Sequence, residues 1–406
     1  MKLVMLAAAD RPLEIEALRA SVAARLEPGS RGLERVDVTD RRAETARWVA
    51  DEGFNVSGHV RRREPTAGID ERGAWAVASQ LMSERLDHGR PLWAFDVIGP
   101  LADGREAIVA RIHHAMADGI SCVRFLDEVL WDDQAQADRP TRPTESPTRE
   151  GRHGHQLRRL PGTLARELGH RASDSILDRP IGATRELAFA AAPLARLHAI
   201  GASRPGHATV NDVLLAGIAG GLRSWLAAAG ERAGRLRAQV PVSLHHRDEG
   251  AGALGNRDSF LNVDLPLAEP DALTRLDAIS AETGARKRLG DAEEMYDLFH
   301  ALGRCKPIER AVERLAAGPR EFSVSISNVP GPRGPLAVCG REVEQLRSVA
   351  EPAARHALRV SAISCSGTVG IGLCTDPEAV SGIARLAGAI EEAVAELADA
   401  AKVASR

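Results

Sequence analysis

Hydrophobic positions recur at helical spacing in two segments of the N-terminal third of the chain. The stretch LEIEALRASVAARL (residues 13–26) repeats apolar residues every three or four positions, which predicts a surface helix packed on a core. The stretch AWAVASQLMSERLDHG (residues 74–89) has the same period, and Gly89 is the expected C-cap. The N-terminal third therefore contains at least two amphipathic helices.

Two short apolar runs lie between these helices and a third one. PLWAFDVIG (residues 91–99) and EAIVARIHH (residues 106–114) are joined by a segment with an Asp-Gly turn, which predicts a pair of strands. ISCVRFLDEVLW (residues 120–131) then places Ile120, Val123, Leu126 and Leu130 on one helical face. The histidines that end the second run are expected at a strand–turn–helix junction.

The second half of the chain also mixes strands and helices. The pattern predicts a strand and a helix within residues 184–201, a long helix over 209–230, strands at 236–244 and 322–328, and a hairpin over 359–373 with Ser-Gly at its tip. The last helix is expected to begin with Asp376 as N-cap and Pro377 at its first position. Strict strand–helix alternation is absent, so we predict an α+β protein rather than a doubly wound one.

A linker separates two predicted domains. Residues 139–174 contain four prolines, many arginines and several Ser and Thr residues, which is typical of a solvated connection. We therefore expect an N-terminal domain over 1–138, a linker over 139–178 and a C-terminal domain over 179–406. An arginine-rich linker could also contact a phosphate group, although a solvated face is the usual fate of such charge runs.

Composition narrows the class of protein. The chain has 406 residues, 44% hydrophobic and 27% charged, with a net charge of -3, and aromatic residues make up only 3%. These values are those of an ordinary globular protein and argue against a nucleic-acid partner. The five cysteines lack metal-ligand or CxxC spacing, so we expect reduced thiols and a cytoplasmic location. No long apolar run predicts a membrane span; contact with a membrane or lipid-droplet surface stays open.

The stretch HHAMADG carries the candidate chemistry, through His113, His114, Asp118 and Gly119. Adjacent residues of a strand face opposite sides, so we expect only one histidine to face a channel, and a metal site is disfavoured. A neutral imidazole there can take a proton from a hydroxyl or an amine. Asp118 could orient the ring or simply cap the next helix, and Gly119 leaves room for substrate or for close helix entry.

Other catalytic motifs are absent from the sequence. There is no G-x-S-x-G nucleophile elbow or P-loop. The second histidine pair, His245 and His246, lacks Asp and Gly at the offsets found after the first pair. It lies in a polar, glycine-rich run that predicts a loop, so we regard only the first pair as a candidate site.

HHxxxDG is the signature of the coenzyme A-dependent acyltransferase superfamily. Further blocks occur in family order: RPLW (90–93), TVNDVLLAG (209–217), VPVSL (240–244), LGNR (254–257) and SNVPGP (327–332). Together they resemble the bacterial wax ester synthase/diacylglycerol acyltransferase (WS/DGAT) family. The resemblance implies a two-domain, chloramphenicol acetyltransferase-like fold of mixed sheets with flanking helices, and an active-site tunnel between the halves.

The resemblance also assigns roles to residues. It implies that His114 is the general base, that His113 assists or shapes the site, and that Asp118 is structural; substrate-binding roles fall on Gly119, Pro91, Leu92, Trp93, Asn211, Asp212 and Asn328. Structural alternatives remain for several of these residues. Asn211 and Asp212 could only cap a helix, the Pro-Leu-Trp segment could pack in a core, and Asn328 could serve only its turn.

The expected reaction is transfer of an acyl group from acyl-CoA to an alcohol-type acceptor, without cofactor, metal or covalent intermediate. One alternative is a condensation-like enzyme that takes its acyl group from a separate carrier protein. Another is a catalytically silent relative that binds acyl ligands. The family has a further short segment before its first strand, whereas this chain begins almost directly at that strand. We therefore expect an acceptor pocket of altered shape, which could suit a specialised acceptor.

Overall fold

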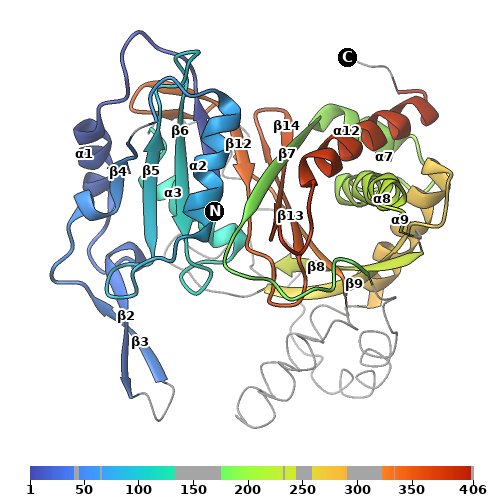
Figure 1. Cartoon of the computed structure of the whole chain (residues 1–406), viewed down its shortest axis with the longest axis horizontal. Helices are drawn as coiled ribbons and strands as arrows, with labels where there is room; N and C mark the ends of the chain where they lie inside the picture. The colour runs from blue at the N-terminus through green and yellow to red at the C-terminus, as the bar shows by residue number, and fades with distance from the viewer. Residues whose placement is uncertain are drawn as a thin grey trace.

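The computed structural model describes residues 1–40, 45–64, 66–132, 175–231, 234–243, 258–289, 322–332 and 334–403. The linker expected at 139–174, the LGNR block and the His245-His246 pair lie outside these residues. Two halves stand side by side, each built on one mixed sheet, and the N-terminus lies between them (Figure 1).

The N-terminal half contains a six-stranded sheet in the order β11-β12-β1-β6-β5-β4, antiparallel except for the pair β4–β5. Its elements are β1 (Lys2–Leu6), α1 (Ile15–Arg25), η1 (Arg31–Leu33), η2 (Val56–Gly58), β4 (Val60–Arg62), α2 (Glu71–Ser83), β5 (Trp93–Ile98), β6 (Glu106–Ile112), α3 (Gly119–Val129), β11 (Ala337–Val338) and β12 (Arg341–Ser348). A separate hairpin, β2 (Glu34–Asp40) and β3 (Thr45–Ala50), projects from this half (Figure 1).

Side-chain alternation in β1 shows how this sheet is covered on both faces. Leu3 and Met5 pack in one buried cluster with residues of α2, whereas Val4 and Leu6 belong to another with residues of α1 and α3. Because successive strand residues point to opposite faces, a run of apolar residues such as KLVML suits a strand buried on both sides.

The C-terminal half contains a second six-stranded sheet, in the order β7-β14-β13-β10-β8-β9. Strand β10 is parallel to β13 and β8, and the other pairs are antiparallel. Its elements are β7 (Glu186–Pro193), α7 (Leu194–Ala202), α8 (Val210–Ala228), β8 (Arg235–Ser243), β9 (Asp258–Pro266), α9 (Ala272–Leu289), β10 (Val324–Val329), β13 (Leu358–Cys365), β14 (Thr368–Thr375) and α12 (Ile383–Ala400).

The helices of this half pack on one face of the sheet around α8 (Figure 1). Helix α8 touches α12 through glycines: a Cβ added at Gly217 would lie 2.7 Å from Val394, and one at Gly221 would lie 2.6 Å from Ile390. The two backbones can approach this closely only because α8 has no side chain at these positions.

Sheet membership does not follow chain order. Strands β11 and β12 come from the second half of the sequence, yet they pair in the N-terminal sheet, where β12 lies against β1. The next strand, β13, returns to the C-terminal sheet. The two halves are therefore joined by a strand exchange as well as by the segment between α3 and β7.

Most predicted elements are confirmed, including the two strands before the histidine pair and the hairpin turning at Ser366 and Gly367. Two predicted helix ends are wrong. Helix α2 ends at Ser83 with Glu84 as its C-cap, so Gly89 lies beyond the helix and does not cap it. Helix α12 begins at Ile383 after Gly382, whose φ is 77°, because the Asp376 carboxylate accepts instead from the backbone N–H groups of Gly182 and Glu378.

Candidate active site

The HHAMADG segment forms a turn between β6 and α3. Strand β6 ends at Ile112, and the backbone N–H of His113 still donates to the carbonyl of Leu92 on the neighbouring chain segment, at 2.9 Å. The N–H of Met116 then donates back to the His113 carbonyl, also at 2.9 Å. The histidine pair is therefore held by backbone bonds on both sides, one of them to the segment leading into β5.

Asp118 is the N-cap of α3, which is one of the two roles that the sequence left open for this carboxylate. Its Oδ1 accepts from the backbone N–H of Ser121 at 2.8 Å, and the side chain is only 1% exposed. An N-cap of this kind satisfies one of the N–H groups that a helix leaves without an internal partner. Asp118 thereby fixes where α3 begins and where the preceding turn ends.

Both histidines line the same cavity, so the expectation that only one of them faces it is wrong. That expectation placed the pair on a strand, where neighbours alternate between faces. In the structure the strand ends before His113, and His114 already belongs to the turn. Alternation therefore no longer separates the two rings.

His113 is fixed as one tautomer by a backbone contact. Its Nδ1 accepts from the N–H of Ala115 at 3.1 Å, so in the neutral ring the proton is on Nε2. The His88 ring meets it edge-on with a centroid distance of 5.6 Å. Burial, and the neighbouring His88 and His114, lower the pKa of His113, so this ring is a neutral hydrogen-bond donor near pH 7.

His114 also has a lowered pKa. Burial within the fold lowers its pKa, with Arg359 acting in the same direction, although much of the side-chain surface is open to the cavity. A hydrogen bond with its own backbone opposes this shift. Because the pKa is lowered overall, the His114 ring is neutral near pH 7.

The cavity has a volume of about 880 Å³ and is walled by both halves. Such a volume is in the range of sites that enclose small organic ligands. Its lining includes Lys2, Leu81, Arg111, His113, His114, Asp118, Gly119 and Cys122 from the N-terminal half, and Arg185, Ser327, Asn328, Glu351, Arg359 and Ser361 from the other.

The two halves meet closely beside the motif. A Cβ added at Gly119 would lie 2.8 Å from Cγ2 of Val329, at the end of β10. The next residue back along β10, Asn328, lines the cavity, and Ser327 donates to Ser361 across to β13 at 3.1 Å. Each half therefore contributes one of the sequence motifs to this contact: HHAMADG from the N-terminal half and SNVPGP from the C-terminal half.

Pro91, Leu92 and Trp93 are not among the described residues that line the cavity. Leu92 and Trp93 are each 1% exposed in the core of the N-terminal half. The Trp93 indole donates to the carbonyl of Gly32 at 2.8 Å, and the ring of His59 stacks against it. Leu92 and Trp93 therefore pack in the core at the start of β5. A substrate contact by this segment stays a prediction.

Asn211 and Asp212 also lie away from the cavity lining in the described part of the chain. Asp212 and Thr209 form a reciprocal capping box at the start of α8. The other oxygen of Asp212 accepts from the hydroxyl of Thr283 on α9 at 2.6 Å. Asp212 thus ties two helices together, and a direct role of this pair in substrate binding stays a prediction.

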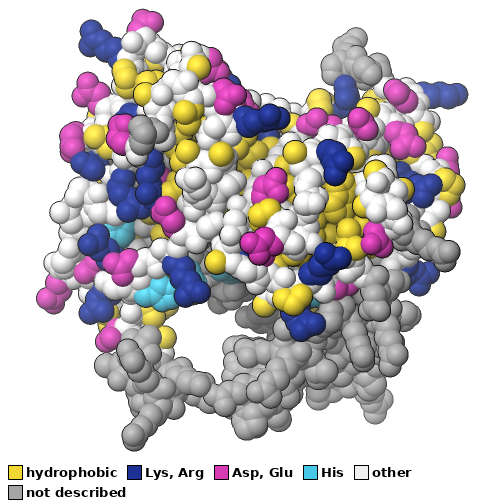
Figure 2. All heavy atoms as spheres, viewed as in Figure 1, with side chains coloured by type: hydrophobic (Ala, Val, Ile, Leu, Met, Phe, Trp, Pro, Cys, Tyr) yellow, Lys and Arg dark blue, Asp and Glu magenta, His cyan; other side chains and the backbone are white. Residues whose placement is uncertain are grey.

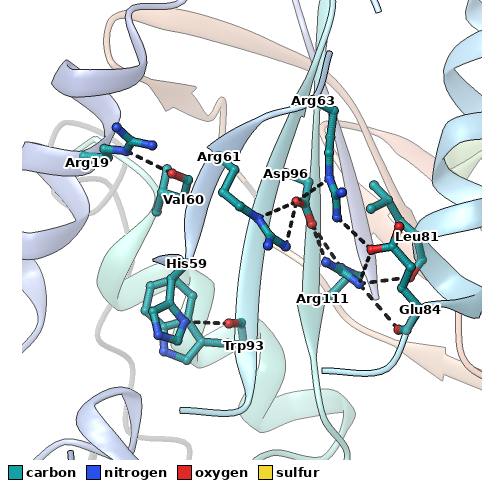
Figure 3. A network of polar contacts seen from close by, with 10 residues as sticks. All are labelled: Arg19, His59, Val60, Arg61, Arg63, Leu81, Glu84, Trp93, Asp96 and Arg111. Carbon is teal, nitrogen blue, oxygen red and sulfur yellow. Dashed lines mark hydrogen bonds and ion pairs between the residues drawn. The ribbon is translucent and has the colours of Figure 1, made fainter. Parts of the chain in front are cut away.

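A buried charge network that the sequence analysis did not anticipate supports the motif (Figure 3). Asp96 on β5 is fully buried and lies between Arg61, Arg63 and Arg111, with contacts of 3.1, 2.9 and 2.8 Å. Arg111 also donates to the carbonyl of Leu81 at 3.1 Å. Because Arg111 is two residues before His113, this network anchors the end of β6.

Two of the cations on the cavity wall have carboxylate partners. Arg111 pairs with Asp96 and lies 3.6 Å from Glu84, and Arg185 donates to Glu351 at 2.7 Å. Within the described residues, no group of three or more His, Cys, Asp or Glu side chains is placed to hold a metal ion. The chemistry that the described site offers is that of imidazole bases and hydrogen-bond donors.

Comparison with known proteins identifies the family. Residues 2–173 match the family described as the wax ester synthase/diacylglycerol acyltransferase catalytic domain, and residues 254–398 match the WS/DGAT C-terminal domain. A relative from Mycobacterium tuberculosis, whose name describes it as a probable diacylglycerol O-acyltransferase, is 31% identical over 94% of this chain and 88% of its own length.

Solved structures confirm the expected fold. The wax ester synthase/diacylglycerol acyltransferase from Marinobacter aquaeolei VT8 superposes with a TM-score of 0.70 at 23% identity, covering 99% of this chain and 94% of that one. The first condensation domain of the CDA synthetase superposes with a TM-score of 0.62 at 17% identity, covering 98% and 90%.

The two-sheet fold with a histidine motif at its junction defines an acyltransferase of the chloramphenicol acetyltransferase-like class. Within that class, the chain belongs to the WS/DGAT family. It is an enzyme that transfers acyl groups to an alcohol acceptor.

Proposed function

We propose that this protein transfers the acyl group of acyl-CoA directly to a hydroxyl acceptor, with His114 as general base. The observation that carries the proposal is the placement of His114 on a turn that opens into the cavity between the halves. A base with a lowered pKa at that position is unprotonated near pH 7 and can accept a proton from a bound alcohol.

The reaction needs one proton acceptor and no enzyme nucleophile. His114 takes the acceptor's hydroxyl proton as the oxygen attacks the thioester carbonyl. The tetrahedral intermediate then collapses, the C–S bond breaks, and the imidazolium returns the proton to the coenzyme A thiolate. The products are an ester and free coenzyme A, so atoms and charge balance.

His113 and Asp118 have positioning roles in this proposal. The Nε2–H of His113 can donate a hydrogen bond into the cavity, where it helps to orient a carbonyl or hydroxyl oxygen. Asp118 holds the start of α3 and thereby the turn that carries His114. Asn328 and Gly119 contribute to the wall opposite and beside the base.

Contact with a membrane or lipid-droplet surface from the cytoplasm is part of the proposal, because a long-chain alcohol partitions into an apolar phase. Among the described helices, none has the length and apolar character of a membrane span. Acidic and basic side chains are interspersed over the face seen in Figure 2.

Pre-steady-state mixing tests direct transfer. Enzyme with acyl-CoA alone should release no burst of thiol and gain no mass, and adding the alcohol should start release of coenzyme A with an equal amount of ester. Cys122 is the thiol to watch, because it lines the cavity while its Sγ contacts the Ala117 carbonyl at 3.6 Å. An acylated peptide containing Cys122, formed without acceptor, would refute the direct mechanism.

The donor and the acceptor are tested in parallel. A mass-spectrometric screen with a mixed acyl-CoA pool and a panel of alcohols should yield esters, whereas the same acyl groups on a carrier protein should be transferred more slowly. Faster transfer from the carrier protein would favour a condensation-like enzyme. Thermal stabilisation by acyl-CoA without turnover over the whole panel would indicate a silent acyl-binding protein.

A further inference from the structure

A buried lysine lies in the cavity wall and has no part in the proposed acyl transfer. Lys2 is 4% exposed and is the first residue of β1, where it pairs with Ser348 of β12 on one side and Ala110 of β6 on the other. Its Nζ donates to the hydroxyl of Ser348 at 2.7 Å. Lys2, Ser348 and His114 all line the same cavity.

The surroundings of Lys2 leave its ammonium group without a counter-ion. In the described part of the chain its side chain makes one hydrogen bond, to a neutral hydroxyl, and no ion pair with a carboxylate. An ammonium group has three N–H donors, and burying it unpaired costs free energy. Burial accordingly lowers the pKa of Lys2.

The other charges of the cavity do not compensate for Lys2. Glu84 and Glu351 are engaged with Arg111 and Arg185, and the Asp118 carboxylate caps α3. These three acids are therefore committed to contacts of their own.

A second cation, Arg359 on β13, lines the same cavity from the C-terminal half. Its charge acts on His114, whose pKa it lowers, so it lies within electrostatic range of the proposed base. Lys2 and Arg359 are therefore two of the cations in the cavity wall, which Met1, Arg85, Arg111 and Arg185 also line, and the field of these charges is strong in a partly enclosed space.

An anion in that space is more readily supplied by the acceptor than by coenzyme A. The thioester sulfur must reach His114, and the pantetheine arm then holds the phosphates of coenzyme A far from the reacting carbon. Lys2 is deeply buried, whereas those phosphates belong toward the solvent end of the site. The acceptor, in contrast, must place its hydroxyl beside His114 and its remaining atoms within the cavity.

We infer that Lys2 and Arg359 form an anion-binding subsite, and that the preferred acceptor is an alcohol that also has a carboxylate or phosphate group. This inference rests on the proposed function of His114 as base toward a hydroxyl. A bound anion gives the Lys2 ammonium its missing partner and orients the hydroxyl toward His114. Charge-assisted hydrogen bonds of this kind are among the strongest that a protein forms.

Matched acceptor pairs test the inference. An ω-hydroxy fatty acid is compared with the primary alcohol of equal chain length, and a 1-acylglycerol 3-phosphate with the 1-acylglycerol. The wild-type enzyme should show a higher kcat/KM for the anionic member of a pair. In Lys2→Met the ratio of anionic to neutral kcat/KM should fall about 10- to 100-fold, the loss expected for one charged hydrogen bond. The two pairs show whether the carboxylate or the phosphate is preferred.

The control is Lys402→Met, the same substitution at an exposed lysine far from the cavity lining, which should keep the wild-type ratio. No preference of the wild-type enzyme for either anionic acceptor would overturn the inference. An equal fall of kcat/KM for both members of a pair in Lys2→Met would also overturn it, because Lys2 would then act on the reacting centre rather than on the acceptor's charge.

A binding measurement separates this inference from the proposed function. Without acyl-CoA, the ω-hydroxy fatty acid should raise the Tm of the wild-type protein more than the neutral alcohol does, and Lys2→Met should abolish the difference. If the folded enzyme transfers no acyl group to any alcohol, the proposed function fails. The Tm difference between the anionic and the neutral ligand still shows whether the anion-binding subsite exists. If Lys2→Met does not fold, Arg359→Met replaces it in both measurements, with the same loss of anion selectivity expected.

Discussion

Gly119 and Val329 bring the two halves of the molecule together beside the turn that carries His113 and His114. A Cβ at Gly119 would lie 2.8 Å from Cγ2 of Val329, closer than real side chains approach. The motif glycine is therefore explained by contact with the opposite half.

Gly119→Ala should move the two walls of the cavity apart. Overpacking of this kind costs about 1–3 kcal/mol, and small displacements of reacting groups can cost up to about 100-fold in rate. We expect a fall in kcat/KM, measured with a saturating acyl-CoA and varied alcohol. Val329→Ala in the same chain should restore much of the activity.

Gly388→Ala is the matched control for this substitution. Gly388 lies within α12, and a Cβ there would meet nothing within 4 Å. Alanine should therefore be neutral or stabilise the helix by about 0.5–1 kcal/mol. If Gly119→Ala behaved like Gly388→Ala, the close contact across the halves would have no bearing on catalysis.

His114→Ala should lower kcat/KM by about 10²–10⁴-fold, the usual contribution of a general base. His113→Ala should have a smaller effect, because that ring is expected to orient oxygen atoms rather than move a proton. Circular dichroism and Tm should show both variants folded. Near-full turnover by His114→Ala with an inactive His113→Ala would reverse the assignment within the pair.

Asp118→Ala should lower both stability and rate. Loss of an N-cap costs about 0.5–2 kcal/mol, visible as a lower Tm, and the turn before α3 would loosen. Asp118→Asn should retain most of the stability, because Asn is an equally good N-cap. An unchanged Tm together with abolished activity in Asp118→Ala would mean instead that the carboxylate acts in the chemistry.

The pH dependence of kcat/KM should follow His114. Its pKa is lowered from 6.5, so the basic form persists to lower pH and the acidic limb of the profile should lie below 6.5. The unfolded chain binds this proton at higher pH than the folded one. Neutral His114 therefore makes its full contribution to the free energy of unfolding above pH 6.5. This contribution is lost as the pH falls through the lowered pKa of the folded state. An acidic limb above 6.5 would contradict this assignment.

Asp96→Asn should be strongly destabilising. It would leave Arg61, Arg63 and Arg111 clustered around a neutral amide, and breaking a buried ion pair on one side costs about 3–5 kcal/mol. Asp277→Asn is the comparison, since its pair with Arg204 lies at the surface and should be worth less than about 1 kcal/mol. Equal Tm values for the two variants would show that the Asp96 network does not stabilise the fold.

Local pattern predicted much of the fold. The alternation in residues 359–373 was sufficient to place a hairpin and its tip, and the position of Asp118 before an apolar helix offered the observed N-cap as one of two possible roles. The start of α12 was wrong because Asp-Pro resembles a helix start, whereas the Asp376 carboxylate binds N–H groups elsewhere in the half. The spacing of residues near Asp376 cannot reveal a contact with a residue as distant in sequence as Gly182.

The site was harder to predict than the fold, because its residues are brought together by contacts between segments far apart in the sequence. The histidine pair and Asn328 could be predicted as neighbours only through the family resemblance, because β6 and β10 belong to different sheets. Lys2 was overlooked although it opens an otherwise apolar strand, a signal that a polar side chain is being buried. Arg111 lies two residues before the motif, yet its partner Asp96 is determined by strand register rather than by spacing.

The position of β1 between β12 and β6 has a consequence for biosynthesis. Until β12 leaves the ribosome, β1 has one edge without a hydrogen-bonding partner, and such edges invite pairing with other chains. The catalytic turn is attached to β6, on the other side of β1. A nascent chain that already contains both histidines therefore still lacks a finished sheet beneath them, and the enzyme matures as one unit only after its C-terminal half has been translated.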